Sequence, residues 1–294
     1  MIRCPRCRLE HPDREPGCPG CGFAPASIGG FPAWAPELAG NGEGFRPEYF
    51  ERLATLEGGH FWFRARNVLI GWAIGAHFPL ARDYLELGCG TGYALAGIAQ
   101  RFPAMRLTAS ELLSAGLAFA AARVPTARLL QLDARSPPWV EEFDLVGAYD
   151  VLEHIDEDER VLRGIRESLR PGGGVVLTVP QHPWLWSESD RYACHVRRYR
   201  RGELERKLEA AGFRVLRSSS FVTLLLPLMA ASRLRPATGS AYDPMAEFRI
   251  PTAINRALEG MLRLEIGAIR LGCSLPVGGS RLVVAVRDDA PATR

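Results

Sequence analysis

The feature that most constrains the fold is the alternation of short apolar segments with helical patterns after Pro79. Apolar segments of strand length lie at Asp83–Leu87, Arg106–Ser110, Ala127–Leu132, Phe143–Tyr149, Gly174–Val179 and Phe213–Ser218. Helical patterns separate them at Tyr93–Arg101, Leu113–Arg123, Asp156–Leu169 and Arg201–Ala211. A last β-rich run is Ser280–Arg287. Strands that alternate with helices stack into a mostly parallel sheet with helices on both faces, so an α/β fold is expected.

The first strand runs into a glycine-rich turn, Gly88-Cys89-Gly90-Thr91-Gly92, and then into a helix. Glycines in such a turn let the backbone pass close beneath a ligand. The turn follows a carboxylate, Glu86, and lacks the later glycine that dinucleotide-binding folds use against pyrophosphate. Glu111 ends the next strand, where an acid can accept the hydroxyls of a ribose, and Asp133 follows the third strand. This pattern indicates an adenosine ligand without a phosphate.

With the glycine-rich turn, Glu111 and Asp133 in this order, the sequence resembles the class I S-adenosylmethionine-dependent methyltransferases. Further matching segments are Phe143–Ile155 and Leu169–Gly174. The resemblance implies S-adenosyl-L-methionine as cofactor and a Rossmann-like, seven-stranded, mostly parallel sheet whose last strand is antiparallel. It also implies a cofactor site made of Glu86, Gly88, Cys89, Gly90, Gly92, Glu111, Leu112, Asp133, Ala134, Tyr149 and, from the N-terminal helix, Arg66.

Polar side chains cluster after the fourth and fifth strands, where ligands of parallel sheets bind. The candidate catalytic residues are Asp150, Glu153, His154 and His195. A histidine can take a proton from a hydroxyl or an amine near neutral pH, although His154 could equally pack at the start of the following helix. The candidate substrate-binding residues are His182, Trp184, Trp186, Tyr192, Arg197 and Tyr199.

The segment from Asp150 to His154 also resembles the acid-x-x-acid-His pattern of some O-methyltransferases, including ubiquinone-pathway and small-RNA 2'-O enzymes. There the resemblance implies a divalent ion, Mg²⁺, that binds and acidifies a hydroxyl acceptor. This sequence has Asp150 where those enzymes usually carry Glu.

Two Cys-x-x-Cys pairs lie near the N-terminus, Cys4 with Cys7 and Cys18 with Cys21. This spacing is typical of tetrahedral zinc sites, and a site closed by four thiolates is structural rather than catalytic. The module either folds the N-terminus onto the core or recognises a partner, as zinc ribbons do in some ribosomal RNA methyltransferases.

The predicted organisation has five parts. They are a zinc ribbon or knuckle at 1–28, a linker and N-terminal helical cap at 29–80, the methyltransferase core at 81–220, a helical insertion or lid at 221–274 and the final core strand at 275–290. The glycine- and proline-rich stretch 24–44 is the expected linker, and 252–271 has helical apolar spacing within the insertion.

The charge balance is nearly even, with 36 basic and 33 acidic residues and a net charge of +3, so a wholly polyanion-binding surface is not expected. No secretory signal is visible, and the longest apolar run, 221–231, is too short to span a bilayer. We expect a cytoplasmic protein. The leading function is methylation of a small or medium-sized metabolite on oxygen, nitrogen or carbon.

Two alternatives remain at this stage. One is an RNA methyltransferase with a basic face that joins the ribbon to the loop Arg191–Arg201. The other is a non-catalytic sensor that binds the cofactor or a partner protein.

Overall fold

A computed structural model of the chain describes residues 1–12, 17–40, 48–233 and 249–289. Its main sheet has the strand order β10-β11-β9-β8-β5-β6-β7-β4-β3. The parallel strands are β5 (Asp83–Leu87), β6 (Arg106–Glu111), β7 (Arg128–Gln131), β8 (Phe143–Tyr149) and β9 (Leu169–Pro180). Strand β11 (Ser280–Arg287) runs antiparallel to both β9 and β10 (Phe213–Phe221). The seven expected strands and the reversed last strand are confirmed.

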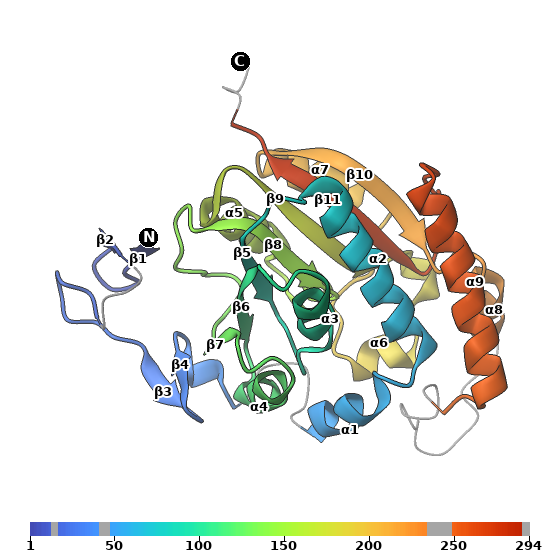
Figure 1. Ribbon diagram of the computed structural model, residues 1–294, viewed down its shortest axis with the longest axis horizontal. Helices are drawn as coiled ribbons and strands as arrows, with labels where there is room; N and C mark the ends of the chain where they lie inside the picture. Colours follow the sequence, from blue (N-terminus) through green and yellow to red (C-terminus); the bar gives the residue numbers. More distant parts are fainter. Residues whose placement is uncertain (13–16, 41–47, 234–248, 290–294) are drawn as a thin grey trace.

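Two layers of helices cover the sheet (Figure 1). One face packs against α2 (Phe61–His77), α3 (Tyr93–Arg101), α4 (Ser114–Arg123) and α9 (Thr252–Arg270). The other face packs against α5 (Asp158–Ser168) and α7 (Glu203–Ala210). Alternate residues of one strand point to opposite faces of the sheet. Tyr84 packs in the core on the α2 side, and Leu85 packs in the core on the α5 side. Both faces are therefore apolar, as a buried parallel sheet requires.

The stretch expected to be a linker contains a hairpin that belongs to the sheet. Strands β3 (Ala26–Ile28) and β4 (Phe31–Ala33) pair with each other, and β4 continues the sheet beside β7. The Gln131 side chain holds this segment, because its amide donates to the Ala35 carbonyl (2.8 Å) and accepts from the Ala35 N–H (3.0 Å). The turn residues Gly29 and Gly30 were visible in the sequence, but a glycine- and proline-rich composition does not distinguish a hairpin from a linker.

The N-terminal cysteine segment packs beside this edge of the molecule (Figure 1). Its short strands β1 (Ile2–Arg3) and β2 (Glu10–His11) form a separate two-stranded sheet. The Arg3 N–H donates to the Pro138 carbonyl (2.7 Å), and the buried Ile2 side chain joins the core beside Trp139. Backbone hydrogen bonds thus attach the segment to the core.

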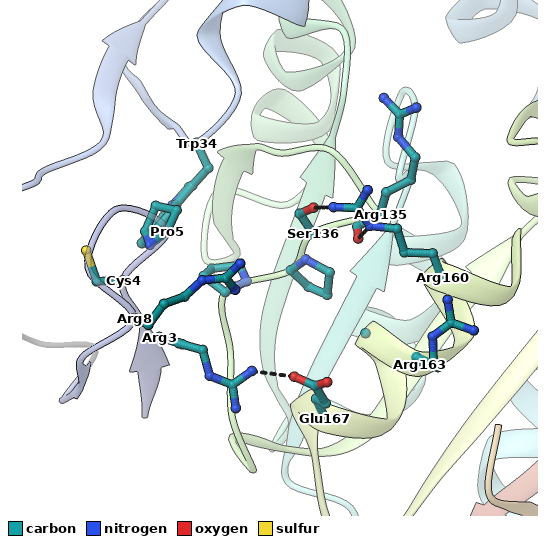
Figure 2. A pocket seen from close by; sticks show the side chains of 13 residues that line it. Arg3, Cys4, Pro5, Arg8, Trp34, Arg135, Ser136, Arg160, Arg163 and Glu167 are labelled. Carbon is teal, nitrogen blue, oxygen red and sulfur yellow. Dashed lines mark hydrogen bonds and ion pairs between the residues drawn. The ribbon is translucent and has the colours of Figure 1, made fainter. Parts of the chain in front are cut away.

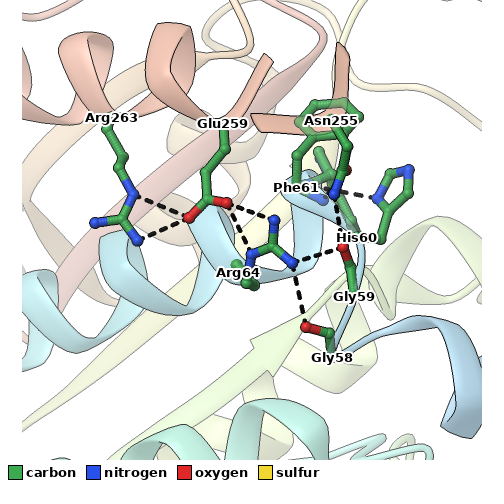
Figure 3. Close-up of polar contacts among 9 residues, drawn as sticks. Gly58, Gly59, His60, Phe61, Arg64, Asn255, Glu259 and Arg263 are labelled. Atoms are coloured by element: carbon green, nitrogen blue, oxygen red, sulfur yellow. Dashed lines mark hydrogen bonds and ion pairs between the residues drawn. The ribbon is translucent and has the colours of Figure 1, made fainter. Parts of the chain in front are cut away.

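The region after β10 is helical, as expected, with α8 (Leu226–Arg233) and then α9. Helix α9 lies along α2, where Asn255 accepts a hydrogen bond from the Phe61 N–H (2.8 Å) and donates to the Gly59 carbonyl (2.7 Å) (Figure 3). Arg64 pairs with Glu259, Nε to Oε2 at 2.8 Å. The insertion therefore fixes the turn at which α2 begins. Part of the apolar run 221–231 is core, because Phe221, Val222 and Leu225 are buried.

The remaining described elements are short. They are α1 (Glu48–Leu56), α6 (Glu188–Tyr192) and the 3-10 turns Pro36–Leu38 after β4, Leu152–His154 after β8 and Pro183–Leu185 after β9. None of the described helices has the length and apolar character needed to cross a membrane.

Candidate functional site

The glycine-rich turn leaves β5 at the carboxyl edge of the sheet. Gly88 and Gly92 have φ angles of +68° and +76°, which side chains rarely adopt. A Cβ on Gly88 would lie 2.6 Å from a Val151 methyl group, and a Cβ on Gly92 would lie 2.8 Å from the Ala120 Cα. The glycines therefore allow both the turn itself and its close packing against β8 and α4.

Glu111, at the end of β6, is bonded to this turn. Its Oε2 accepts a hydrogen bond from the Gly90 N–H (2.9 Å), and its Oε1 accepts one from the Leu113 N–H (3.2 Å). Burial raises the pKa of this carboxyl, while the backbone donors act in the opposite direction. Because a carboxylate has about four acceptor positions, each oxygen can still accept a ligand hydroxyl.

Glu86 lies in the interior, 2% exposed, and accepts a hydrogen bond from the Tyr84 hydroxyl (3.2 Å). Burial raises its pKa to about 8, against the smaller opposing effects of Tyr84 and Arg66. The Tyr84 hydroxyl also lies 3.1 Å from the Tyr149 hydroxyl, from which it can accept a hydrogen bond. These groups form a buried polar network under the turn.

Arg66, from α2, reaches the same edge and forms an ion pair with Asp150. Its guanidinium lies 4.5 Å from the centre of the Trp62 ring, and its Nε is buried without a partner among the described residues. A buried donor that is left open is costly, so this nitrogen is a candidate to bind a ligand carboxylate.

Asp133 and Ala134 follow β7, beside Leu112. Asp133 accepts a hydrogen bond from the Arg135 N–H (2.9 Å) and pairs with its guanidinium. The Gln131 side chain donates to the Leu112 carbonyl (3.0 Å). The cofactor-side residues named from the sequence thus occupy one edge, over the ends of β5, β6 and β7.

Glu153, His154 and His195 form a second group, after β8 and β9. Each offers a ligand atom, and these atoms lie within 4.8 Å of one another. The two imidazole rings are 4.7 Å apart at 82°, and His195 Nε2 lies 4.0 Å from Glu153 Oε1. Glu153 is fully buried, and both of its carboxyl oxygens lack a hydrogen-bond partner among the described residues. An acid in this state needs a proton, a metal ion or a ligand.

Burial keeps two members of this group, Glu153 and His154, neutral. Burial raises the pKa of Glu153 well above its usual range, with a further contribution from Asp150. Burial lowers the pKa of His154 to about 3, with a smaller contribution from His195. At neutral pH His154 is therefore a neutral imidazole, which suits a metal ligand better than a general base.

Asp190 orients His195. Its Oδ1 lies 2.9 Å from His195 Nδ1 and 2.7 Å from Arg198 Nε. Burial works against ionisation of Asp190, but His195 and Arg198 outweigh it and hold its pKa at about 2. A carboxylate on Nδ1 leaves Nε2 facing Glu153, which is the usual arrangement behind a metal-binding imidazole.

The predicted substrate-binding residues divide into two groups. His182 stacks on the exposed Trp184 at 5.6 Å, and Tyr192 stacks on Tyr49 of α1 at 4.3 Å. Trp186 is half-buried. Arg197 and Tyr199 instead both contact Asp158, at 2.9 Å and 2.7 Å. Tyr199 is 1% exposed, and Asp158 is a structural partner of both side chains.

The four N-terminal cysteines converge. All four sulfurs lie within 4.8 Å of one another, with Cys4 to Cys21 at 3.6 Å and Cys7 to Cys18 at 3.4 Å. A tetrahedron with Zn–S bonds of about 2.3 Å places sulfurs roughly 3.8 Å apart. The spacing is far too long for disulfides, and it fits a four-thiolate metal site.

Sequence reasoning missed a network behind the glycine turn. The Thr91 hydroxyl donates to Glu57 of the turn after α1 (2.8 Å), and Arg123 of α4 pairs with the same carboxylate (2.6 Å). These partners are 34 and 66 residues from Glu57, so no local pattern marked them.

Comparison with known proteins identifies the family. Residues 55–218 match the model of a methyltransferase domain family. A Mycolicibacterium smegmatis protein named for S-adenosylmethionine-dependent methyltransferase activity is 30% identical over 159 residues, which is 53% of this chain and 60% of that protein. Trans-aconitate 2-methyltransferase of Deinococcus radiodurans is 36% identical over 97 residues, 33% of this chain and 37% of that enzyme. The chain thus spans less than two thirds of the length of these relatives.

Solved structures share the fold. A chain of the complex between the Haloferax volcanii Trm112 methyltransferase activator and a candidate methyltransferase has a TM-score of 0.55 at 20% identity, covering 83% of this chain and 96% of that chain. Haemonchus contortus phosphoethanolamine N-methyltransferase 2, bound to S-adenosyl-L-methionine, has a TM-score of 0.50 at 18% identity. The match covers 76% of this chain and 52% of that chain. Since the domain match covers more than half of the chain, the chain belongs to this family, the class I S-adenosylmethionine-dependent methyltransferases.

Proposed function

We propose that the chain transfers a methyl group from S-adenosylmethionine to a small or medium-sized metabolite by in-line displacement. The observation that carries the proposal is the buried group Glu153, His154 and His195 beside the cofactor edge, with carboxyl oxygens that nothing in the described chain satisfies. A non-catalytic sensor has no use for such a group, whereas an acceptor site does.

On the cofactor side, we assign the ribose hydroxyls to Glu111 and the adenine edge to Asp133. We assign the amino group of the methionine part to Glu86 and its carboxylate to Arg66. Since methyl transfer is a displacement at a sulfonium carbon, the main task of these residues is to hold that carbon in line with the acceptor.

On the acceptor side, we propose that Glu153, His154 and His195 bind a divalent metal ion. The donor set is one carboxylate and two imidazoles, which suits a first-row transition metal such as Mn²⁺ or Fe²⁺ better than Mg²⁺, whose ligands are oxygens. Asp150, expected as a ligand from the resemblance, is paired with Arg66 instead. A metal ion there would lower the pKa of a hydroxyl acceptor.

The metal hypothesis is tested by removing the ion. Exhaustive chelation should abolish turnover and leave cofactor binding intact, and Mn²⁺ should restore turnover. Turnover that persists without any metal would instead assign proton transfer to His195, held by Asp190.

The substrate class is tested with labelled methyl donor and an extract of the source cells, divided into RNA, protein and small-molecule fractions. Label in the small-molecule fraction supports the proposal. Label in RNA would support the alternative in which the N-terminal module grips RNA. Carboxylates reduce the charge of the expected basic face at Arg191–Arg201, because Arg191, Arg197 and Arg198 each pair with one, whereas Arg200 and Arg201 are exposed.

For Cys4, Cys7, Cys18 and Cys21 we propose a structural zinc site within a module that ends near residue 28. Native protein should contain about one equivalent of zinc beyond the acceptor-site metal. Cys18→Ser should lower zinc content, whereas the matched Cys273→Ser, at an exposed cysteine, should not. Equal zinc in the two variants would contradict the assignment.

A further inference from the structure

A cavity of about 450 Å³ lies between the N-terminal segment and the core, where the loop after the proposed cofactor residues Asp133 and Ala134 lines it (Figure 2). Arg3 and Arg8 approach it from the N-terminal segment, and Arg160 and Arg163 approach it from α5. We call this cavity the interface pocket.

The charge of the interface pocket is strongly positive. Its lining includes Arg3, Arg8, Arg135, Arg160 and Arg163 but a single acid, Glu167. Arg3 pairs with Glu10 and Glu167, and Arg135 pairs with Asp133 and Glu157. Carboxylates thus compensate two of the arginines.

None of the other three arginines forms an ion pair with a carboxylate of the described residues, although the charge of Arg160 contributes to the lowered pKa of Glu157. Arg160 donates to the Arg135 carbonyl (3.0 Å) and to the Ser136 hydroxyl (2.7 Å), both of which are neutral. Arg8 and Arg163 make no side-chain hydrogen bond or ion pair within the described chain. Three cations facing one cavity repel one another, so the arrangement favours an anion.

The walls of the interface pocket are held in place. The Arg3 N–H bonds to the Pro138 carbonyl (2.7 Å) and the Val140 N–H to the Met1 carbonyl (2.9 Å), so the segment carrying Arg3 and Arg8 is fixed against the 135–140 loop. The Arg160 guanidinium is fixed by its bonds to that same loop. A site formed in advance binds its ligand at a lower entropic cost.

We propose that the interface pocket binds the phosphate of a nucleotide unit. The planar, forked guanidinium matches phosphate oxygens, and the volume is that of a site for an organic ligand rather than for a bare ion. Trp34, Pro5 and Pro137 supply apolar surface for the rest of the ligand, including an aromatic ring on which a base can stack. The assignment does not depend on methyl transfer. The nucleotide unit comes from a free nucleotide or from a single-stranded RNA, which share this chemistry.

The test is a titration of the full chain with two probes, AMP and a fluorescein-labelled penta-uridylate. S-adenosylhomocysteine is present at saturation so that AMP cannot enter the cofactor site. The variants are Arg163→Ser and the double variant Arg160→Ser/Arg163→Ser. The matched control is Arg214→Ser, at an exposed arginine of β10 whose side chain has no polar partner among the described residues, at the opposite edge of the sheet.

We expect Arg163→Ser to weaken binding about tenfold or more and the double variant to weaken it further, with the control unchanged. Tighter binding of the oligonucleotide than of AMP, with a salt dependence that falls by about 0.7 in log–log slope per arginine removed, assigns the site to RNA. AMP binding of equal or greater strength assigns it to a free nucleotide. Absence of binding by both probes, or equal affinity in all variants with unchanged thermal unfolding, overturns the proposal.

Discussion

The two halves of the proposed site are built differently. On the cofactor side, over the ends of β5 and β6, Glu111 already accepts two backbone N–H groups and the glycine turn is packed tightly against its neighbours. On the acceptor side, after β8 and β9, Glu153 is buried, and no residue of the described chain satisfies either of its oxygens. The chain itself holds the cofactor side together, whereas the proposed acceptor side has no such bonds at Glu153.

The two sides differ because their hydrogen-bond partners come from different parts of the chain. The cofactor side uses backbone groups that follow the strands directly, so its geometry is set locally. The acceptor side brings together Glu153 and His195 from separate loops and depends on Asp190 to aim one imidazole. Effects on affinity should therefore arise on the first side and effects on turnover on the second.

The largest expected effect is on turnover. Glu153→Gln should lower kcat about 10³-fold, because the amide can neither bind a metal ion as a carboxylate does nor transfer a proton. The dissociation constant of S-adenosylmethionine, measured by calorimetry, should stay within about twofold. Glu159→Gln, at an exposed acid of α5, is the control. Loss of cofactor affinity equal to the loss of kcat would show that the two sides are not separate.

The corresponding variant on the cofactor side is Glu111→Gln. It should weaken cofactor binding about 10²-fold, because two charge-assisted hydrogen bonds to ribose hydroxyls become neutral or are lost. At saturating cofactor, kcat should fall much less. Glu51→Gln, at an exposed acid of α1, serves for comparison. A variant that binds cofactor normally would remove Glu111 from the site.

A smaller effect concerns stability and pH. Glu86 has a folded pKa of about 8 against an ordinary value of 4.5, because burial disfavours its charge. The folded chain therefore holds a proton that the unfolded chain releases between these pH values. The bound proton contributes fully to the free energy of unfolding below about pH 4.5. This contribution is lost as the pH rises to about 8, at no more than about 1.4 kcal/mol per pH unit.

Glu86→Gln has no such proton to lose. In cofactor-free protein the variant should therefore lose less stability than the parent chain between pH 6 and pH 8, by on the order of 2 kcal/mol. Urea unfolding at both pH values measures this. Parallel pH profiles would place the Glu86 carboxylate in a better-solvated environment.

The smallest effect links the two sides. Tyr49 of α1 stacks on the predicted substrate-binding residue Tyr192 of α6 at 4.3 Å, so the ring pair joins the two helices. Tyr49→Leu keeps an apolar side chain but removes the ring pair, so the KM for the cofactor should rise about threefold to tenfold. A change confined to kcat would assign the stack to the acceptor side alone.

The sequence predicted the order of strands and helices closely, and β5, β8, α3 and β11 have the predicted bounds. It did so because apolar periodicity and turn residues are local properties. It mistook the β3–β4 hairpin for a linker, since that hairpin is recognisable only from its pairing with β7. The roles of the site residues remain predictions.

The sequence by itself determined the α/β alternation, the glycine turn, the acids that end β5 and β6, and the two cysteine pairs, because each lies within a short stretch of chain. Only the tertiary structure decided that Arg66 pairs with Asp150, 84 residues away, and that His195 joins Glu153 and His154. It alone placed unpaired arginines of two distant segments around one cavity. Such contacts depend on how the helices pack on the sheet, which no local pattern encodes.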